Sequence, residues 1–434
     1  MKFGLFYELQ LPTPWEEDGI GRLFRETLEH IVLAEKLGFD CIWGVEHHFL
    51  EDHSLSSSPG TWLAAAAALT SRIRIGHGIA CTPPGFVHPA RLAEHIATLD
   101  QLSGGRVEFG TGESASRMEL EGFGVDPLTK RGGWEEAVRE IASMMAMTPY
   151  PGHQGEFFSM PCRNLVPKPR QKPHPPLWVA GKPDLAARNG MGCLGFNVMS
   201  IEMAKQAVDA YYNILARECV PIGHAINPNI AVLANMHVHP DPAIARERGS
   251  ELRFFGYSVS KYYLGGKVRP GRSHFWDEFE QVRDTMPDMG ADNPTSAIGT
   301  VEEVRRHVRG LEEAGVDQML LMHQGGKMKH EWNCASLELF AREIMPEFQD
   351  RHAEREAAKL ERLAPALEQA LARKDWPREL ADDDVPVVEP YGSASFIPTP
   401  RTRWSMRAQA PRPGERSGLA DFGANRASAA HPEP

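Results

Sequence analysis

The feature that most constrains this chain is the alternation of short apolar runs with longer amphipathic segments over residues 1–350. Runs rich in β-branched and aromatic residues predict strands, and segments with an apolar face every 3.6 residues predict helices. Eight runs fit the strand pattern: 2–7, 39–45, 73–80, 106–111, 177–181, 194–199, 229–237 and 317–322. Eight strands that alternate with helices predict an α/β TIM (β/α)8 barrel, whose active site lies at the carboxyl ends of the strands.

Helix-capping residues support this pattern. Gly38 follows the first amphipathic segment, as a C-terminal glycine does. Ser58 and Pro59 supply an N-cap and a first-turn proline to an alanine-rich segment over 59–70. A further helix is predicted over 131–147. The local signals therefore agree with the barrel.

Three long excursions interrupt the alternation. Residues 112–130 and 148–176 are rich in Gly and Pro, and residues 252–296 are rich in aromatic side chains. Long excursions of this kind in a barrel favour a lid over the active site, although packing against a neighbouring helix or subunit is an alternative. We therefore predict a lid insertion over 252–296.

The composition changes after residue 350. Residues 351–375 are rich in Glu, Arg, Lys and Ala and predict a solvated helix. Over 376–434, Pro, Ala, Arg and Gly dominate and the periodicity disappears, which predicts a largely disordered tail.

Charge and cysteine content exclude several classes of protein. A formal net charge of −11 argues against a nucleic-acid binder, which needs a basic surface. No apolar run reaches the roughly 18 residues that a membrane span requires, so we expect no membrane association. The six cysteines are scattered without a C-x-x-C, which argues against a disulfide framework or a zinc site. We predict a cytoplasmic protein.

The residues just after each predicted strand are informative, since a TIM barrel builds its active site there. The most pointed group is the run Glu46-His47-His48. Alternation places Glu46 and His48 on one side of the chain and His47 on the other. A histidine at a strand end can exchange protons near neutral pH, although an arbitrary His-His pair is more often structural. We predict His47 and Glu46 as catalytic residues.

Other strand ends offer candidate ligands for an anion. Gly181 and Lys182 lie between a strand and a helix that starts near Asp184, where backbone N–H groups and a lysine suit a phosphate. Arg131 opens another predicted helix and is a second candidate phosphate ligand. No G-x-G-x-x-G follows the first strand and the chain has no P-loop, which excludes those nucleotide-binding motifs.

Metal catalysis is the alternative for the histidine-rich strand end. Several side chains could offer ligand atoms: Glu46, His47, His48, His53, and the H-x-H pair His237 and His239. Barrel metallohydrolases of the amidohydrolase type usually carry H-x-H at the end of the first strand, where this chain has Phe6-Tyr7-Glu8. We therefore predict no metal in the catalytic site.

Three segments together carry a family resemblance: GFDCIWGVEHHF (38–49), IRIGHGIACTPPGFVHPARLAEHIATLDQLSGGRVEFGTG (73–112) and GFGVD (122–126). The ordered combination of W-x-x-E-H-H-F, H-P-x-R-x-A-E and L-D-Q-L-S-G-G-R is specific, although no single piece would suffice. Over roughly residues 1–350 the sequence resembles the bacterial luciferase-like flavin-dependent monooxygenases.

This resemblance implies a TIM barrel, usually a homodimer, that binds reduced FMN supplied by a separate flavin reductase. In such enzymes O2 adds to the flavin, and the resulting C4a-peroxyflavin inserts one oxygen atom into the substrate. Because this species must be shielded from water, the aromatic excursion gains a purpose as a lid. We expect a small hydrophobic substrate such as a ketone, aldehyde, terpene or aromatic compound.

The resemblance also implies roles for individual residues. His47 matches the catalytic histidine and Glu46 its acidic neighbour, while Gly78-Ile79 matches the strand end that supports the isoalloxazine ring. The phosphate contacts correspond to Gly181, Lys182 and Arg131. Among the flavin contacts we also count residues at or near other strand ends, namely Thr111, Glu113 and Met199.

Two departures and two alternatives qualify the resemblance. Bacterial luciferase has a Cys-Arg pair where this chain has Gly112-Glu113, and the phosphate loop here is shorter and lacks its Glu-Ser residues, so we do not predict light emission. A deazaflavin-dependent hydride-transfer oxidoreductase on the same fold is the nearest alternative, and its relatives more often carry a single histidine or Asp-His at this strand end. A non-catalytic flavin-binding partner is the other, which the retained His47 disfavours.

Overall fold

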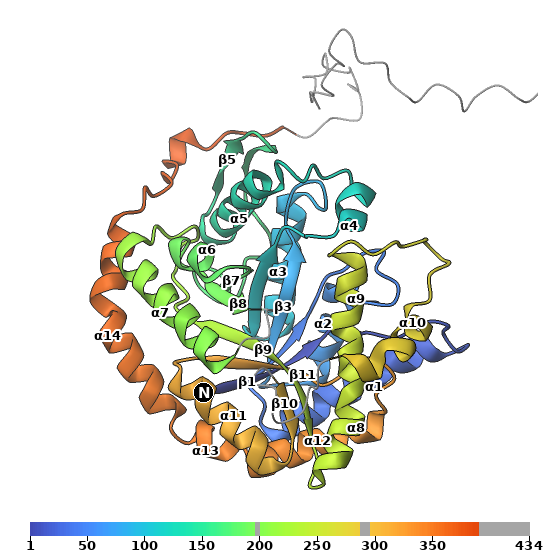
Figure 1. Cartoon of the computed structure of the whole chain (residues 1–434). Helices are drawn as coiled ribbons and strands as arrows, with labels where there is room; N and C mark the ends of the chain where they lie inside the picture. Colours follow the sequence, from blue (N-terminus) through green and yellow to red (C-terminus); the bar gives the residue numbers. More distant parts are fainter. Residues whose placement is uncertain (196–199, 287–295, 390–434) are drawn as a thin grey trace, which may run out of the picture. The chain divides into compact units, whose positions relative to one another are not determined.

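The computed structural model describes residues 1–195, 200–286 and 296–389. In this part of the chain, eight parallel strands close into a TIM barrel (Figure 1). They are β1 (Lys2–Tyr7), β2 (Cys41–Gly44), β3 (Arg74–Cys81), β4 (Val107–Gly112), β7 (Leu177–Ala180), β8 (Gly192–Gly195), β9 (Ile230–Val238) and β11 (Gln318–Met322). They pair in this order, and β11 pairs with β1 to close the ring. A further strand, β10 (Ser296–Gly299), adds to the side of β9.

Side chains of each strand alternate between the barrel interior and the layer beneath the helices. In β1, Phe6 belongs to the inner cluster, while Leu5 and Tyr7 belong to the outer one. Two inner tryptophans, Trp43 and Trp178, pack edge to face with ring centroids 5.3 Å apart. Burial on both faces explains why the strands appear in the sequence as continuous apolar runs.

Helices cover the outside of the barrel (Figure 1). They include α1 (Gly19–Leu37), α2 (Pro59–Leu69), α3 (Pro89–Leu102), α5 (Lys130–Ala146), α6 (Pro183–Arg188), α7 (Ile201–Glu218), α11 (Val301–Glu313) and α12 (His330–Glu343). Gly38 ends α1 with a left-handed φ of 89°, a conformation in which most other residues are strained, so the predicted C-cap is confirmed.

The predicted strands correspond to the barrel strands, with small differences at their ends. The largest difference concerns 194–199: β8 spans Gly192–Gly195, and residues 196–199 lie outside the described part. Within the excursion 148–176, the chain forms an antiparallel hairpin of β5 (Tyr150–Gln154) and β6 (Ser159–Arg163) that the sequence pattern does not predict. The sequence pattern misses these strands because they contain Pro151 and Pro161, and proline is uncommon in strand interiors.

The aromatic excursion is largely helical. After α8 (Pro242–Gly249) and a 3-10 turn η1 (Ser250–Leu252) come α9 (Arg253–Tyr262), α10 (Phe275–Val282) and η2 (Arg283–Thr285). A separate buried cluster joins them to the segment after β2, formed by Leu50, Phe254, Tyr262, Phe275, Trp276 and Phe279. Residues 287–295 lie outside the described part, and the lid role of 252–296 stays a prediction.

Beyond residue 344 the chain forms α13 (Met345–Gln349), α14 (His352–Ala372) and η3 (Asp382–Asp384). Helix α14 continues through Pro365, packs against α7 and buries Leu363 and Ala370. Residues Met1–Val385 form one compact unit; of the second, Pro386–Pro434, only 386–389 are described. The division into 1–350, 351–375 and 376–434 stays a prediction.

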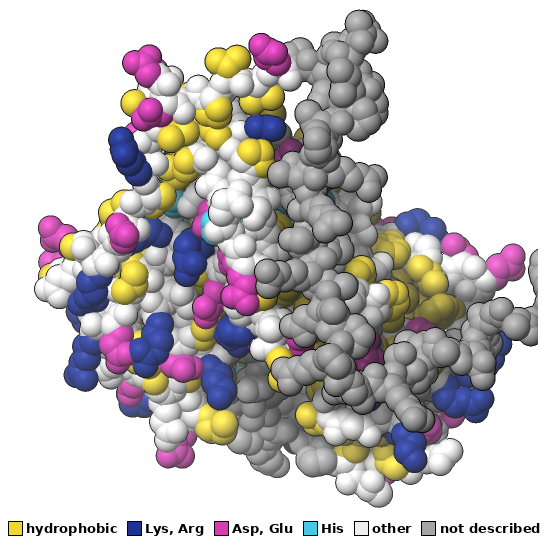
Figure 2. Space-filling view, turned by 90° about the horizontal axis from the view of Figure 1, so that it is seen from above, with side chains coloured by type: hydrophobic (Ala, Val, Ile, Leu, Met, Phe, Trp, Pro, Cys, Tyr) yellow, Lys and Arg dark blue, Asp and Glu magenta, His cyan; other side chains and the backbone are white. Residues whose placement is uncertain are grey.

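Charges of both signs lie on the face of the molecule that Figure 2 shows. On the face visible in Figure 2, Lys and Arg side chains lie interspersed with Asp and Glu. Among the described residues, no helix combines the length and apolar character needed to cross a membrane.

Candidate active site at the mouth of the barrel

His47 is held at the carboxyl end of the barrel by two buried carboxylates and a tyrosine. Its Nδ1 lies 3.0 Å from Glu119 Oε1, on α4 (Arg117–Gly122), and 3.1 Å from the hydroxyl of Tyr263. Its Nε2 lies 3.6 Å from Oε2 of Glu8, the residue after β1. The His47 side chain is 20% exposed, whereas those of Glu8 and Glu119 are 4% and 1% exposed. The ring is fixed by its partners while part of it stays open.

The electrostatics of this group favour a proton on His47. Burial lowers the pKa of His47, but the charges of Glu8 and Glu119 outweigh it and leave the pKa above its usual value. Burial raises the pKa of Glu8 to about 7, even though His47 lowers it. Burial also works against ionisation of Glu119, but hydrogen bonds from His47 and Ser114 hold its pKa below the usual value. Glu119 therefore carries a charge, and Glu8 and His47 titrate as a coupled pair.

Unusual backbone conformations surround this group. Leu9, Phe49 and Ser114 have φ angles of 52°, 65° and 59°, and among the described residues they alone combine positive φ with a side chain. The Ser114 hydroxyl donates to Oε2 of Glu119 at 2.5 Å, and the other two residues directly follow site residues. Such conformations cost about 1–2 kcal/mol each and cluster at functional sites. The residues with positive φ therefore lie beside the side chains of the His47 group.

Glu46 and His48 form their own pair, separate from His47. Nε2 of His48 lies 3.1 Å from Oε1 of Glu46, whose Oε2 accepts the backbone N–H of Cys81 at 3.0 Å. Side-chain alternation predicted this separation. Glu46 ties the segment after β2 to the end of β3, and the catalytic roles of Glu46 and His47 stay predictions.

A second histidine connects the barrel to α9. Nδ1 of His53 lies 2.8 Å from Oγ of Ser258 on α9, and its Nε2 lies 3.8 Å from Oε2 of Glu8. Gln10 also donates to the Ser258 hydroxyl, at 3.1 Å. Burial lowers the pKa of His53 well below its usual value, so this ring is neutral. The aromatic excursion therefore contacts the His47 group directly.

The predicted flavin contacts on β3 and β4 have defined surroundings. The Gly78–Ile79 peptide bond is cis, and Ile79 packs against the inner cluster of the barrel. A Cβ atom on Gly112 would lie 2.6 Å from Ile79 Cδ1, so the two strand ends touch here. The Thr111 hydroxyl donates to the carbonyl of Trp178 and accepts from the indole of Trp134, both at 3.1 Å. This hydroxyl is thus engaged in the barrel wall.

The other predicted cofactor contacts do not all converge. Arg131 donates to Glu113 at 2.6 Å, so these two candidates bind each other. Gly181 and Lys182 are exposed at the start of α6. Met199 lies outside the described residues. Each of these assignments stays a prediction.

Sequence reasoning missed the partners of His47. Glu8 stands at a strand end, which is a usable signal, but nothing in the pattern gives its burial. Glu119 and Tyr263 come from excursions without a periodic signal, 72 and 216 residues away from His47.

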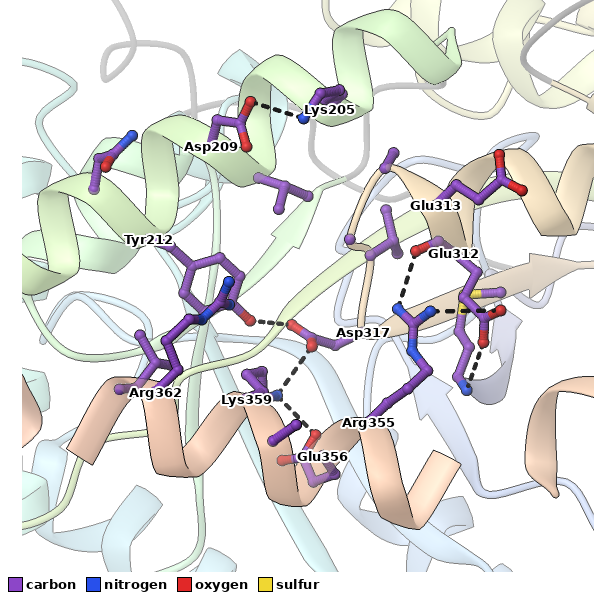
Figure 3. Close-up of a pocket in the computed structure, with 18 of the residues that line it drawn as sticks. Lys205, Asp209, Tyr212, Glu312, Glu313, Asp317, Arg355, Glu356, Lys359 and Arg362 are labelled. Carbon is purple, nitrogen blue, oxygen red and sulfur yellow. Dashed lines mark hydrogen bonds and ion pairs between the residues drawn. The ribbon is translucent and has the colours of Figure 1, made fainter. Parts of the chain in front are cut away.

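Among the described residues, two further cavities lie away from the His47 group. The larger, of about 790 Å³, lies between α7, the end of α11 and α14 (Figure 3). Its charged groups are largely paired, as Lys359 is with Asp317 at 2.9 Å. Met1 lines it, so it belongs to the amino-terminal end of the barrel, whereas TIM-barrel active sites lie at the other end. The smaller, of about 440 Å³, lies beside α1 and α12.

Comparison with known proteins finds similar sequences and structures over most of the chain. The oxygenase component of the flavin-dependent trigonelline monooxygenase of Acinetobacter baylyi is 25% identical over 82% of this chain and 98% of its own. An F420-dependent glucose-6-phosphate dehydrogenase of Amycolatopsis mediterranei is 28% identical over 40% of this chain and 52% of its own. The crystal structure of a monooxygenase from Streptomyces bottropensis superposes with a TM-score of 0.66 at 26% identity, covering 80% of this chain and all of that one.

The model of one protein family, described as luciferase-like monooxygenase, matches residues 1–318. This match covers the whole barrel up to the start of β11, including every described residue of the His47 group. The chain belongs to the luciferase-like monooxygenase family.

Proposed function

We propose that this protein is an FMN-dependent, two-component monooxygenase that inserts one oxygen atom from O2 into a small hydrophobic substrate. The observation that carries the proposal is His47, whose ring Glu119 and Tyr263 fix at the mouth of the barrel and whose pKa lies above its usual value. The trigonelline relative is the oxygenase component of a flavin-dependent enzyme, which supports a separate reductase as the source of reduced FMN.

The barrel interior offers groups that fit a flavin ring. Nε1 of Trp43 and Oδ1 of Asn235 are buried without a hydrogen-bond partner among the described residues, and Oε2 of Glu8 has only the longer contacts with His47 and His53, at 3.6 Å and 3.8 Å. Glu8 lies two residues after Phe6, and Asn235 lies two residues after Leu233. Since Phe6 and Leu233 belong to the inner cluster, strand alternation directs Glu8 and Asn235 towards the barrel interior as well. Unpaired donors and acceptors in an apolar wall suit a heteroaromatic ring that carries N–H and C=O groups. Gly78 and Ile79 would support that ring.

The flavin phosphate would bind near the start of α6. Lys182 is exposed there, and its ammonium group has no hydrogen-bond partner in the described part of the chain. We assign Gly181 and Lys182 to the phosphate, with Arg131 as a second cation that now pairs with Glu113. Thr111, Glu113 and Met199 would be further contacts.

The protein's own residues would manage protons and water around the flavin. When bound, reduced FMN would supply the two electrons that let one atom of O2 enter the substrate while the other leaves as water. With Nδ1 of His47 hydrogen-bonded to Glu119, the proton to be moved is the one on Nε2. Glu8 lies 3.6 Å from that nitrogen, and its pKa of about 7 lets it accept or return the proton. The aromatic residues of α9 would exclude water from the site.

The remaining parts of the proposal concern assembly and location. Helix α2 carries no charged residue, and Leu69 on α2 and Leu102 on α3 are 56% and 64% exposed. Exposed apolar residues on neighbouring helices favour a homodimer through this face. All six cysteines are free thiols, which suits the cytoplasm.

The proposal is tested with the full chain, FMN, NADH and an unrelated flavin reductase. We expect O2-dependent conversion of a ketone or terpene, with one atom from isotopically labelled O2 in the product. His47→Asn should lower product formation by about 10²–10⁴-fold, while His352→Gln on α14 should leave it unchanged. Absence of labelled product from a broad panel of ketones, aldehydes and terpenes would contradict the monooxygenase assignment. Unchanged product formation in His47→Asn would contradict the role of His47.

Deazaflavin-dependent hydride transfer is the second candidate, since one relative is an F420-dependent dehydrogenase. The two reactions separate cleanly under anaerobic conditions. Turnover with F420 in the absence of O2, and none with reduced FMN and O2, would establish this alternative in place of the monooxygenase.

A further inference from the structure

A group of metal-binding side chains lies outside the active site, between α1 and α12. His30 comes from α1, and His330 and Cys334 lie four residues apart on α12, which places them on one face of that helix. One ligand atom from each of the three lies within 4.8 Å of the others. Glu29, also on α1, reaches the same place with its Oε2 3.3 Å from Nε2 of His330.

Two distances in this group already match a tetrahedral zinc site. Zinc binds nitrogen and oxygen at about 2.0–2.1 Å and sulfur at about 2.3 Å, so the ligand atoms of a tetrahedron lie roughly 3.3–3.6 Å apart. Oε2 of Glu29 and Sγ of Cys334 lie 3.3 Å and 3.6 Å from Nε2 of His330. The distances of these two atoms from Nε2 of His330 therefore already suit a shared zinc ion.

The fourth ligand, His30, requires a side-chain rotation. Its ring stacks on that of His330 with centroids 4.7 Å apart and 18° between the planes, whereas two ligands of one ion point their nitrogens at it. If the His30 ring is the one that rotates, His330 keeps its present distances to Glu29 and Cys334.

The burial of His30 points to a ligand. His30 is 1% exposed, and neither of its ring nitrogens has a hydrogen-bond partner among the described residues. Nδ1 of His330 and Oδ1 of Asn333 are buried and unpartnered in the same place. A buried polar group without a partner destabilises the folded protein, and a metal ion would bind the one ring nitrogen of His30 that carries no proton.

A cavity beside this group gives a cation access to it. The 440 Å³ cavity is lined by His30 and His330 and provides an entrance. Lys327 and Lys329 also line this cavity. The ammonium nitrogens of these two lysines lie 4.5 Å and 4.8 Å from the ring centroids of two tryptophans, Trp276 and Trp332.

We propose that His30, His330, Cys334 and Glu29 bind one zinc ion that joins α1 to α12. Two imidazoles, a thiolate and a carboxylate are ligands that zinc prefers, and they come from helices that frame the first and last strands of the barrel. The site escapes sequence analysis because it has no C-x-x-C: its ligands are an i,i+4 pair on one helix and two residues about 300 positions earlier. The ion would stabilise the closure of the barrel and take no part in the reaction at His47.

The test uses the untagged full-length protein, freed of metal with a chelator and titrated with zinc or cobalt chloride. We expect one zinc ion per chain, release of about one proton from the thiol, and a thiolate-to-cobalt charge-transfer band with cobalt. Cys334→Ser should remove the band, while Cys162→Ser, a matched change of another half-buried thiol, should leave it. Zinc should raise the melting temperature of the wild type and of Cys162→Ser, but not of Cys334→Ser.

Glu29→Gln gives a second variant that does not disturb the core, since the Glu29 side chain is 67% exposed. It should weaken zinc binding by at least about tenfold. Three results would each overturn the proposal: no binding of stoichiometric zinc, cobalt binding without a thiolate band, or zinc binding that Cys334→Ser and Glu29→Gln leave unchanged. Zinc binding lost in His53→Gln instead would assign the ion to Glu8, His47 and His53, the other group able to hold a metal, and would also overturn it.

Discussion

Replacement of Glu8 by Gln tests whether the carboxyl beside His47 is raised in pKa by burial. The change keeps the size of the side chain and removes its charge. The pKa of Glu8 lies at about 7 in the folded protein against 4.5 as its ordinary value, so between these pH values the folded state binds more protons than the unfolded state. The wild type therefore loses stability as pH rises through this window. At about 1.4 kcal/mol per pH unit, the loss amounts to at most about 3 kcal/mol.

Urea unfolding followed by tryptophan fluorescence, at about pH 5 and about pH 8, measures this effect. The free energy of unfolding of Glu8→Gln minus that of the wild type should increase by about 2–3 kcal/mol between the two conditions. The raised pKa of His47 acts in the same direction, because its stabilisation is present at low pH and is lost as the histidine deprotonates. The measured increase therefore reports the combined effect of Glu8 and His47. Glu94→Gln on the surface of α3 is the control, and a difference that stays constant or falls with pH would refute the reasoning.

Three further predictions concern the rest of the site and the barrel. Glu119→Gln removes the charge that helps hold the proton on His47, so the pKa of His47, measured by NMR titration, should fall; an unchanged titration would contradict the assigned contact. Lys182→Ala should raise the KM for reduced FMN by about tenfold with little change in kcat, as expected for loss of one charge-assisted hydrogen bond; an equal loss in kcat would place Lys182 elsewhere. Gly110→Ala would bring a Cβ to 2.1 Å from a backbone oxygen and should cost about 3 kcal/mol or more, whereas Gly256→Ala, in the open on α9, should be neutral or slightly stabilising; equal unfolding free energies for the two variants would contradict this packing.

The barrel could be predicted because its signals are local. All nine residues of β9 are buried, and seven of them are apolar, so this strand appears as an apolar run that only Asn235 and His237 interrupt. The hairpin of β5 and β6 has no such signal, since most of its side chains are partly or fully exposed and its pairing joins segments that contain proline. Strand β10 is only four residues long, and β9 is its one partner among the strands that the structure describes. A short strand is defined by its neighbour in space, which a local pattern does not contain.

The His47 group shows where local reasoning ends. Position at a strand end located His47, and alternation separated it from Glu46, because both signals depend only on adjacent residues. Glu119 lies on a six-residue helix, and Tyr263 follows an excursion helix, so closure of the barrel and packing of its loops bring them to His47. Glu8 was visible as a strand end, yet its chemistry depends on burial, which raises its pKa to about 7. The sequence thus identifies which strand ends meet. The charge on the residues that meet there depends on their burial, which only the folded structure gives. The Glu8→Gln and Glu119→Gln variants therefore test the part of the mechanism that only the folded structure supplies.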